Sequence, residues 1–582
     1  MRRLKPAATS HTMLKELLDR LPPYRRIELR SEPDYYGASY HIAEKLGRPY
    51  PPRSFASWQH GWIAQKQIPF PERLALYGTK DDYHLVHNES HVQYLRQHGY
   101  RHVHAVGMPF LYSTAPAVER IPNSLLVMPP HTTKHATFSA NEAAYLETIM
   151  PLRSQFRFLV ACVSQPCVEK GIWIKSLDDA GIPWITGAAV DDGNSFLRLR
   201  VLFGSFERMT TCNVGSHVVY AAACGCKVSI YGETQRARVS DLVNEPFYRK
   251  HPELIQERDK KSGSLRSQFP QLDVPPAEAT VQTAWAAEML GAQHQRSAAE
   301  IARLLGWSKK RQFLGRHGLS PTFSLQTTGQ IRRAVLRAAP ATATGYYWLR
   351  HQLGHPPANE TETLWRLRRD LRQVPRYVPG SYRFAWGTVQ YVDARSLESQ
   401  YDEIFVKRSY DFTCPTTAPR ILDCGGNTGL SALWFKQQYP QARVRVVELA
   451  PSVGSAVRNN LRVIAADVEV FMVTPGEIPH LITEPVDLLT LNVAGAEASI
   501  LRTIEVANKL NMIRRLTAKI YHTSVDSVAL SRLLHTLQAA GFRCTFNHAE
   551  TAYALVGVPE PTPFTAVTDG KAWLDLYAWQ SN

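Results

Sequence analysis

Four residues spaced as D-x-G-x-N-x-G could form a loop that holds a nucleoside-type cofactor. They are Asp423, Gly425, Asn427 and Gly429, in the stretch ILDCGGNTG. Glycines let the backbone turn sharply and approach a ligand, and the helix that follows such a loop offers free N–H groups. The GxGxxG spacing of a dinucleotide loop is absent, because Asn427 and Leu430 stand where its second and third glycines belong. The loop therefore predicts a ligand other than a dinucleotide.

A glutamate 25 residues after Asp423 completes this expected site. Glu448 ends the apolar run RVRVVE, which predicts a second parallel strand. In a doubly wound sheet, an acid at the end of the second strand faces the first loop and can accept both hydroxyls of a ribose. A ligand with a ribose, an amino-acid tail and no pyrophosphate would suit such a site.

The elements that must position this loop follow one another along the last third of the chain. The order is strand, Gly-rich turn, helix, strand and helix, starting near residue 377, which predicts an α/β domain. Within it, 420–423 is the first strand, 430–436 the helix after the turn, and 443–448 the second strand.

The run from about 377 to 556 resembles the FkbM family of S-adenosylmethionine-dependent O-methyltransferases. Separated motifs carry the resemblance in the same order: YVDARSLESQYDEIFVKRSYDF, PRILDCGGNTGLSALWFKQQYPQARVRVVELAPS, Asn460-Leu461, VDLLTLNVAGAEASIL, and LTAKIYHTS followed by LLHTLQAAGFRCTF. It implies a class I methyltransferase domain over 377–582 that takes S-adenosylmethionine as cofactor. The residues that would shape the cofactor site are Asp423, Gly425, Asn427, Gly429 and Glu448.

Three positions depart from the family pattern on the strand after the shortened segment 461–485. Where the family carries Lys, Asp and Glu, this chain has Thr490, Asn492 and Ala494. Asparagine hydrogen-bonds but does not take up a proton as a carboxylate does. The part missing from this segment would carry the wall that packs on adenine.

Two interpretations stay open for this domain. In the first, the cofactor binds and Asn492, Glu497 and His522 are the candidate catalytic residues, with the proton taken by Glu497, His522 or a residue from elsewhere. Methyl transfer needs little acid–base help beyond this proton, since alignment of donor and acceptor supplies much of the acceleration. In the second, the domain has become a structural partner.

The first 307 residues offer another candidate base. His60 lies in FASWQHGW, where an imidazole at a loop tip suits general-base catalysis; the alternative is an ordinary surface or hydrogen-bonded histidine. In TTCNVGSHVVYAAACGCKVSIYG, the residues Gly215, Ser216 and His217 open a helix whose free N–H groups could cradle a phosphate. The alternative here is an ordinary helix–strand packing unit.

These two segments resemble parts of a GT-B type glycosyltransferase, or of polyol-phosphate transferases with a Trp-His-Gly loop, although Gln59 separates Trp58 from His60. The resemblance implies an N-terminal lobe over 1–120 and a second Rossmann-like lobe over 121–307. Strands are expected at 124–128, 157–162, 183–186 and 227–231. His60 would activate an acceptor hydroxyl, and the helix start at 215–217 would lie near a donor phosphate.

A positively charged segment lies between these two parts of the chain. The 582 residues carry a formal net charge of +16, and the stretch from 309 to 376 holds 13 Lys or Arg against 3 Asp or Glu. This basic helical connector, 308–376, could contact an anionic membrane surface or a phosphorylated glycan carrier, or simply be solvated. Nucleic acid is not an expected partner, because no recognition motif accompanies the charge.

The remaining composition bounds the class of protein. The eight cysteines form no CxxC pair, so no metal site is expected, and no apolar run reaches the roughly 18 residues that a membrane span needs. We therefore expect a cytoplasmic protein, with peripheral contact at the inner membrane through the connector.

Three functions follow as hypotheses. The first is O-methylation of a glycan hydroxyl in surface-polysaccharide biosynthesis, by a methyltransferase fused to a glycosyltransferase-like module that takes a nucleotide-activated sugar. The second is a glycosyl- or polyol-phosphate transferase with a degenerate methyltransferase domain. The third is a non-catalytic scaffold for glycan enzymes.

Overall fold

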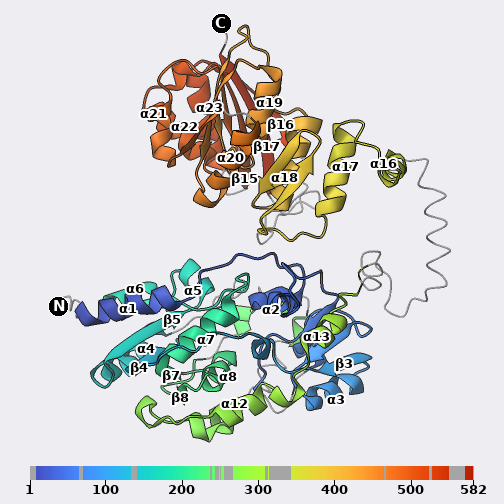
Figure 1. Ribbon diagram of the computed structural model, residues 1–582. Coiled ribbons are helices and arrows are strands. Elements are labelled where there is room, and N and C mark those ends of the chain that lie inside the picture. Colours follow the sequence, from blue (N-terminus) through green and yellow to red (C-terminus); the bar gives the residue numbers. More distant parts are fainter. Residues whose placement is uncertain are drawn as a thin grey trace. The chain divides into compact units, whose positions relative to one another are not determined.

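The computed structural model divides the chain into two compact units, Met1–Thr327 and Thr328–Asn582 (Figure 1). The residues described are 8–64, 68, 70–132, 141–235, 239–242, 245, 248–249, 251–254, 266–308, 312, 343–464, 467–493, 495–523, 527–549 and 571–580. Each unit is an α/β structure with its own sheets.

Unit 1 contains two parallel sheets. The smaller has the order β1-β2-β3 and the larger the order β6-β5-β4-β7-β8. The strands are β1 (Ala56–Trp58), β2 (Tyr83–Val86), β3 (His102–Ala105), β4 (Ile121–Val127), β5 (Phe158–Val163), β6 (Trp184–Thr186), β7 (Phe206–Thr211) and β8 (Lys227–Ile230). Four of the five strands in the larger sheet coincide with the expected ones, and β7 was not expected.

Helices cover these sheets because each strand–helix crossover must bury an apolar face. They are α1 (Ala8–Arg20), α2 (Ala38–Lys45), α3 (Glu89–Gln97), α4 (Glu142–Ile149), α5 (Gln165–Glu169), α6 (Ile174–Asp179), α7 (Ser195–Ser205), α8 (Ser216–Ala223), α9 (Val239–Leu242), α12 (Thr283–Met289) and α13 (Ala298–Leu304). The small residues of α8 let it lie close on the sheet, where Ala221 and Ala222 are fully buried.

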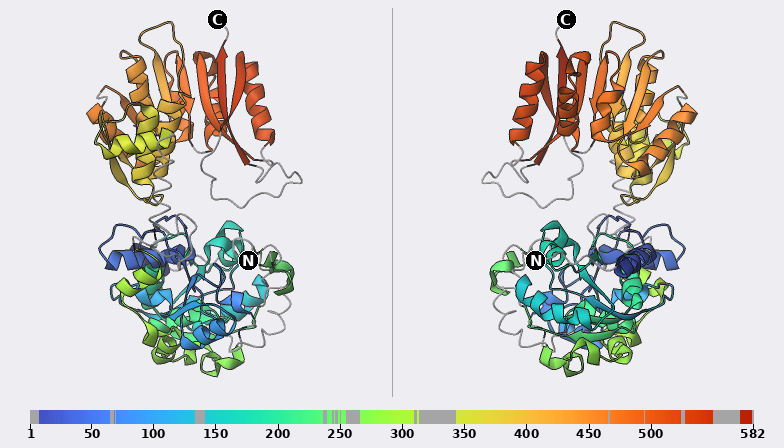
Figure 2. Two further views of the ribbon diagram at one scale, coloured as in Figure 1. Left: turned by 90° about the vertical axis from the view of Figure 1, so that its right-hand side faces the viewer. Right: turned by 90° about the vertical axis from the view of Figure 1, so that its left-hand side faces the viewer.

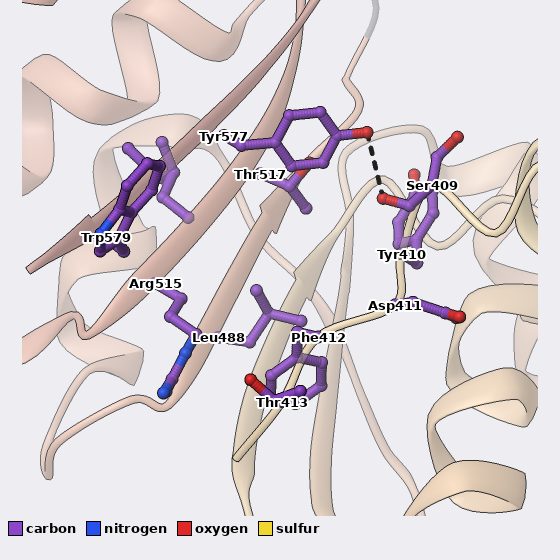
Figure 3. Close-up of a pocket in the computed structure, with 12 residues that line it drawn as sticks. Ser409, Tyr410, Asp411, Phe412, Thr413, Leu488, Arg515, Thr517, Tyr577 and Trp579 are labelled. Carbon is purple, nitrogen blue, oxygen red and sulfur yellow. Dashed lines mark hydrogen bonds between the residues drawn. The ribbon is translucent and has the colours of Figure 1, made fainter. Parts of the chain in front are cut away.

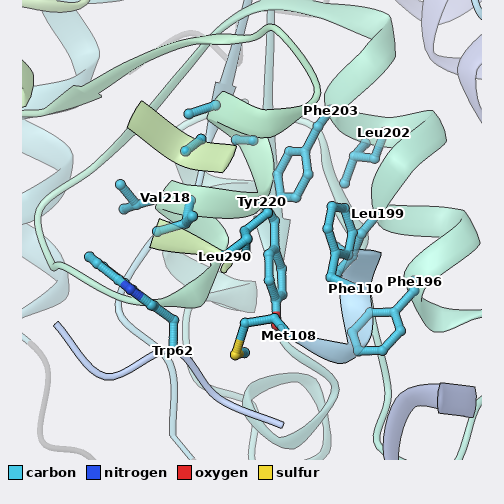
Figure 4. Close-up of a cluster of buried hydrophobic side chains, with 14 of the residues drawn as sticks. Trp62, Met108, Phe110, Phe196, Leu199, Leu202, Phe203, Val218, Tyr220 and Leu290 are labelled. Atoms are coloured by element: carbon cyan, nitrogen blue, oxygen red, sulfur yellow. The ribbon is translucent and has the colours of Figure 1, made fainter. Parts of the chain in front are cut away.

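One apolar cluster joins the two sheets of unit 1. Figure 4 shows Trp62, from the loop after β1, in the same cluster as Phe110 and α8 Tyr220. The rings of Phe110 and Tyr220 stack with centroids 4.2 Å apart. The loop after β1 is thereby packed against a helix of the larger sheet.

Unit 2 has a seven-stranded sheet with the order β13-β12-β11-β14-β15-β17-β16, in which only β17 is antiparallel to its neighbours. The strands are β11 (Arg420–Cys424), β12 (Arg443–Glu448), β13 (Glu469–Met472), β14 (Leu488–Leu491), β15 (Arg515–Thr523), β16 (Phe542–Ala549) and β17 (Lys571–Gln580). A separate hairpin consists of β9 (Gly380–Phe384) and β10 (Gly387–Tyr391).

Helices cover both faces of the seven-stranded sheet, as Figure 2 shows. They are α18 (Ala394–Tyr401), α19 (Leu430–Gln438), α20 (Pro451–Ile464), α21 (Ile478–Leu481), α22 (Glu497–Val506) and α23 (Ser527–Ala539). A π-helical turn, η10 (Asp402–Val406), continues α18. The strand and helix expected around the Gly-rich loop therefore coincide with β11 and α19, and the second strand coincides with β12.

The basic connector is helical where it is described, in α16 (Ala343–Gln352) and α17 (Glu360–Leu371); Arg332 and Arg333 lie outside the described residues. Three arginines of α17 are in ion pairs: Arg366 with Glu362, Arg368 with Glu398 and Asp402, and Arg369 with Asp370. Much of the positive charge of this helix is thus neutralised within unit 2. Across the part of the chain that the structure describes, no helix is long and apolar enough to cross a bilayer.

Candidate functional site

The Gly-rich loop of unit 2 turns at the end of β11. Gly425 and Gly429 have φ angles of +94° and +82°, and Asn427 is left-handed at +47°. A Cβ atom on Gly425 would lie 2.0 Å from the carbonyl oxygen of Asn492, on β14's C-terminal edge. Glycine is needed at 425 both for its backbone conformation and for this close approach.

Asp423 lies beneath the loop rather than on its surface. Its carboxylate accepts hydrogen bonds from Ser431 Oγ at 2.5 Å and from Thr490 Oγ1. Burial raises the pKa of Asp423, and the two hydroxyl hydrogen bonds partly counter that rise. Asp423 therefore fixes the loop between α19 and β14.

Glu448 holds the other side of the loop. Its carboxylate is 7% exposed and accepts the backbone N–H groups of Asn427 at 3.1 Å, Leu449 at 2.8 Å and Ala450 at 3.0 Å. A carboxylate offers about four acceptor positions, so one remains for a ligand hydroxyl. Together, the two left-handed glycines and this carboxylate fit a ribose-bearing cofactor at the end of β11 and β12.

The shortened segment 461–485 still supplies a third strand. β13 pairs with β12 in parallel, and the short helix α21 follows it. Asn460, just before this segment, donates from Nδ2 to the carbonyl oxygens of Thr428 at 2.9 Å and Gln390 at 2.8 Å. It ties the loop to the end of α20 and to the β9–β10 hairpin.

The three candidate catalytic residues of unit 2 have different surroundings. Asn492 Nδ2 donates to the Tyr410 hydroxyl at 3.3 Å. Glu497 is 2% exposed and its two oxygens accept N–H groups of Val493 and Gly495, both at 2.9 Å. These bonds give Glu497 the role of holding the turn before α22. The side chain of His522 and all of Ala494 lie outside the described residues.

An ion cluster that the sequence did not reveal lies on one face of the seven-stranded sheet. Lys519 Nζ of β15 is 2.7 Å from Glu403 Oε1 of the π-helical turn and 3.5 Å from Asp575 Oδ1 of β17. Burial lowers the pKa of Lys519, but the carboxylates of Glu403 and Asp575 outweigh it and raise the pKa overall. The available signal was a lysine within the apolar strand LTAKIYH.

A cavity of about 220 Å³ lies further along this face, between β14, β15, β17 and the segment 409–413. Figure 3 shows Tyr410 at its edge and the hydrogen bond from the Tyr577 hydroxyl to the Ser409 carbonyl oxygen, 3.4 Å long. Leu488, which lines it, begins β14, so the cavity reaches the strand end opposite to the Gly-rich loop.

In unit 1, His60 is held by a buried carboxylate. Its Nδ1 lies 3.0 Å from Oε1 of Glu32, whose side chain is 4% exposed. The other oxygen of Glu32 accepts Ser57 Oγ and, at 3.2 Å, the backbone N–H of Trp58. Among the described residues none hydrogen-bonds to His60 Nε2, and the imidazole is 28% exposed. A base oriented by a carboxylate, with its second nitrogen available, is a general arrangement of catalytic sites.

The structure brings His60 close to the helix start that the sequence singled out. The backbone N–H of Trp62 donates to Ser216 Oγ at 2.9 Å, and the Tyr220 hydroxyl donates to the His60 carbonyl at 3.2 Å. His217 is paired with Thr211 Oγ1 at 3.2 Å, and burial lowers the pKa of its imidazole to about 3. The residues expected as base and as phosphate site thus belong to one region of unit 1.

Glu32 belongs to a segment that also contacts the larger sheet's loop 190–193. Ile27 and Tyr36 donate their backbone N–H groups to the carbonyls of Asp191 and Val190, at 2.9 and 2.8 Å. Tyr36 has a left-handed φ of 57°, which is rare for a bulky residue and occurs where surrounding contacts enforce it. Sequence reasoning missed Glu32 because nothing in the spacing of EPDYYG relates it to His60.

No protein-family model matches the chain. A stretch of 75 residues is 36% identical to Methyltransferase sdnD of Sordaria araneosa, covering 12% of this chain and 29% of that protein. A stretch of 65 residues is 34% identical to Methyltransferase 1 of Beauveria bassiana, covering 11% of this chain and 26% of that protein. The chain spans less than a third of the length of these curated relatives.

Solved structures similar to part of the chain include methyltransferases with a bound cofactor. The O-methyltransferase TomG from Streptomyces achromogenes, in complex with SAM, is 18% identical with a TM-score of 0.21, covering 28% of this chain and 74% of that one. Aeropyrum pernix fibrillarin, with natively bound S-adenosyl-L-methionine, is 18% identical with a TM-score of 0.22, covering 34% and 83%.

The strand order of unit 2 and the two sequence matches both indicate a methyltransferase domain in this chain. A seven-stranded sheet with one antiparallel strand inserted next to the last position is the class I methyltransferase arrangement, and both curated relatives are methyltransferases. Part of the chain is therefore a methyltransferase domain with this fold.

Proposed function

We propose that unit 2 is an FkbM-type methyltransferase that moves the methyl group of S-adenosylmethionine to a hydroxyl of a glycan. The observation that carries the proposal is the contact between the Gly-rich loop and Glu448, whose carboxylate accepts a hydrogen bond from the N–H of Asn427 at 3.1 Å. The carboxylate would receive a ribose hydroxyl, and the N–H groups at the start of α19 would face the amino-acid tail of the cofactor.

The presence of unit 1 in the same chain supports a glycan as the acceptor. Unit 1 contains two parallel sheets and a carboxylate-oriented histidine, features that suit transfer to a hydroxyl group. A single chain with two hydroxyl-modifying sites is consistent with the assembly of a surface polysaccharide, in which sugars are both joined and methylated.

Calorimetric titration of the full chain with S-adenosylmethionine and with S-adenosylhomocysteine tests the cofactor. Both should bind to the wild-type chain, and Glu448→Ala should weaken both by about tenfold or more, since a hydrogen bond to a charged group contributes roughly 1.5–3 kcal/mol. If millimolar concentrations of either compound produce no heat of binding to the wild-type chain, the proposal is wrong.

A second candidate function belongs to unit 1, and the His60–Glu32 pair favours it. In this function, His60 Nε2 takes the proton of an acceptor hydroxyl while a sugar or polyol phosphate is transferred from a nucleotide-activated donor. Glu32 would hold the imidazole in the tautomer that has Nε2 free and would stabilise the imidazolium that forms. The helix start at Gly215, Ser216 and His217 would lie near the donor phosphate.

Transfer of label from UDP-[14C]glucose or CDP-[14C]glycerol to a bacterial surface-polysaccharide fraction tests this second function. The wild-type chain should transfer one of the two, and His60→Ala should lower the rate by about 10²-fold or more. A His60→Ala chain that transfers label at the wild-type rate would remove His60 from the mechanism.

A further inference from the structure

The acceptor hydroxyl of the proposed methyl transfer must lose a proton, and two of the three candidate catalytic residues, Glu497 and Asn492, are poorly suited to take it. Glu497 is buried with both oxygens bonded to backbone N–H groups. Asn492 is an amide and does not act as a base. A different group near the C-terminal edge of β14 must therefore be considered.

The register of the sheet places Lys519 beside this edge. Leu491 of β14 pairs with Ala518 of β15, so Asn492 and Lys519 are the next residues on the two strands. Residues opposite each other in a sheet project to the same face. Lys519 in turn pairs with Asp575 of β17. Three polar side chains therefore follow one another across the edge on one face, in the order Asn492, Lys519 and Asp575.

The chain segment that covers this face brings a second carboxylate to it. The π-helical turn η10 puts Glu403 Oε1 2.7 Å from Lys519 Nζ. Such turns are rare and are often found at functional sites. Glu403 Oε1 also accepts Ser399 Oγ at 3.4 Å, while its Oε2 has no hydrogen-bond partner among the described residues. Glu403 is thus fixed through one oxygen and has the other available.

Tyr410, seven residues later on the same segment, brings a hydroxyl to the same place. It receives a hydrogen bond from Asn492 Nδ2 at 3.3 Å. Burial raises the pKa of Tyr410, and the carboxylates of Glu403 and Asp423 raise it further. The phenol therefore stays protonated and can donate a hydrogen bond, but cannot serve as the base. Lys519 is also unsuited, because its two carboxylate partners keep it protonated.

We propose that Glu403 is the base that takes the proton of the acceptor hydroxyl, and that Lys519 is the positioning residue that holds Glu403 against the edge of β14. Tyr410 and Asn492 would hydrogen-bond the acceptor oxygen. The proposal rests on the proposed methyltransferase function and specifies its acceptor side, which takes a neutral hydroxyl compound such as a hexose.

The step balances without another reactant. The acceptor oxygen forms a bond to the methyl carbon while the bond from that carbon to the cofactor sulfur breaks, and the sulfonium becomes a neutral thioether. The hydroxyl proton goes to Oε2 of Glu403. Release of this proton to water restores the carboxylate.

Four variants of the full chain test the assignment: Glu403→Gln, Lys519→Met, Lys519→Arg and a control, Lys436→Met. The control breaks a similar ion pair elsewhere in unit 2, since Lys436 Nζ lies 2.6 Å from Asp467 and the lysine is 15% exposed, against 16% for Lys519. Binding of [methyl-3H]S-adenosylmethionine is measured by equilibrium dialysis. Label transfer to a panel of p-nitrophenyl hexosides is measured from pH 4 to 9.

Glu403→Gln should bind the cofactor as the wild-type chain does, lower kcat by about 10²-fold or more, and abolish the fall in rate on the acid side. Lys519→Met should lower kcat without weakening cofactor binding, because Glu403 loses the ion pair that positions it, and Lys519→Arg should restore kcat. Lys436→Met should leave both kcat and the pH profile unchanged.

Two failures are distinguishable. A wild-type chain that binds no cofactor, or methylates none of the hexosides, overturns the proposed function and with it the role of Glu403. A wild-type chain that methylates a hexoside, while Glu403→Gln retains its kcat and its acid-side fall, overturns the role of Glu403 alone.

Discussion

The Thr490 hydroxyl donates a hydrogen bond to the carboxylate of Asp423, and this bond joins β14 to β11 beneath the Gly-rich loop. Thr490 stands at a position where the family that the sequence resembles has a lysine. A neutral hydroxyl therefore takes the place of a positively charged side chain beside Asp423. The hydrogen bonds that this buried carboxylate accepts come from the hydroxyls of Ser431 and Thr490.

Replacement of Thr490 by valine should destabilise unit 2. The substitution removes one of the two hydroxyl partners of a buried carboxylate, which costs roughly 1–3 kcal/mol. Thr490→Ser keeps the hydroxyl and should lose much less. Urea denaturation followed by circular dichroism compares the two variants, and equal losses for valine and serine would contradict the assigned bond.

The pH dependence of stability should report the burial of Asp423. Burial raises the folded-state pKa of Asp423 above its ordinary 3.8, so the unfolded chain ionises this group first as the pH rises. The carboxyl group then lowers the free energy of unfolding progressively from about pH 3.8 up to its folded-state pKa. Asp423→Asn should therefore gain stability relative to wild type between pH 4 and pH 7. A constant difference across that range would show that Asp423 is not buried as described.

Alanine at Gly425 should be far more damaging than alanine at Gly495. Both glycines have positive φ angles, +94° and +108°, so both substitutions introduce backbone strain. At Gly425 the new Cβ also meets the Asn492 carbonyl oxygen at 2.0 Å, whereas at Gly495 nothing lies within 4 Å. Thermal unfolding and titration with S-adenosylmethionine should show loss of cofactor binding only for Gly425→Ala.

Changes at Glu32 and His60 should not be additive. Glu32→Gln leaves the imidazole without its carboxylate and should lower label transfer by unit 1 nearly as much as His60→Ala does, because residues that act as a unit have non-additive effects. The double variant should be no slower than His60→Ala. Independent, multiplying effects in this transfer assay would mean that the contact at 3.0 Å has no part in the reaction.

Arg368→Ala should affect stability rather than membrane contact. Arg368 pairs with Glu398 at 2.8 Å and Asp402 at 3.2 Å, and it is partly exposed, so the loss should be within about 1 kcal/mol. If the connector contacts anionic membranes, Arg332 and Arg333 should carry that contact instead. Sedimentation with phosphatidylglycerol vesicles compares Arg368→Ala with the double alanine variant at 332 and 333.

The fold around the Gly-rich loop was predictable because its signals are local. An apolar strand, glycines at 425 and 429, and an acid at the end of the next strand all fall within about 30 residues, where periodicity and spacing are informative. The catalytic role given to His522 stays a prediction, since its side chain lies outside the described residues.

The partners that hold the candidate bases could not be predicted in the same way. Glu32 precedes His60 by 28 residues, and Glu403 precedes Lys519 by 116. Each pair forms only when separate elements pack together, so neither composition nor spacing reveals it. β7 was missed for another reason. Its sequence, FERMTT, carries Glu, Arg and Thr residues that are not typical of a strand in the interior of a sheet, although β7 lies between β4 and β8.

The segment that carries Glu32 fastens the two sheets of unit 1 to each other. At its ends, Ile27 and Tyr36 donate hydrogen bonds to the carbonyls of Asp191 and Val190 in the loop of the larger sheet. The Glu32 carboxylate accepts hydrogen bonds from Ser57 and Trp58 of the smaller sheet. A hinge motion that separated the two sheets would have to break either the hydrogen bonds of Glu32 to β1 or those of its segment to the loop 190–193. In the first case, separation of the two sheets would take Glu32 away from His60 and leave the imidazole without its carboxylate partner.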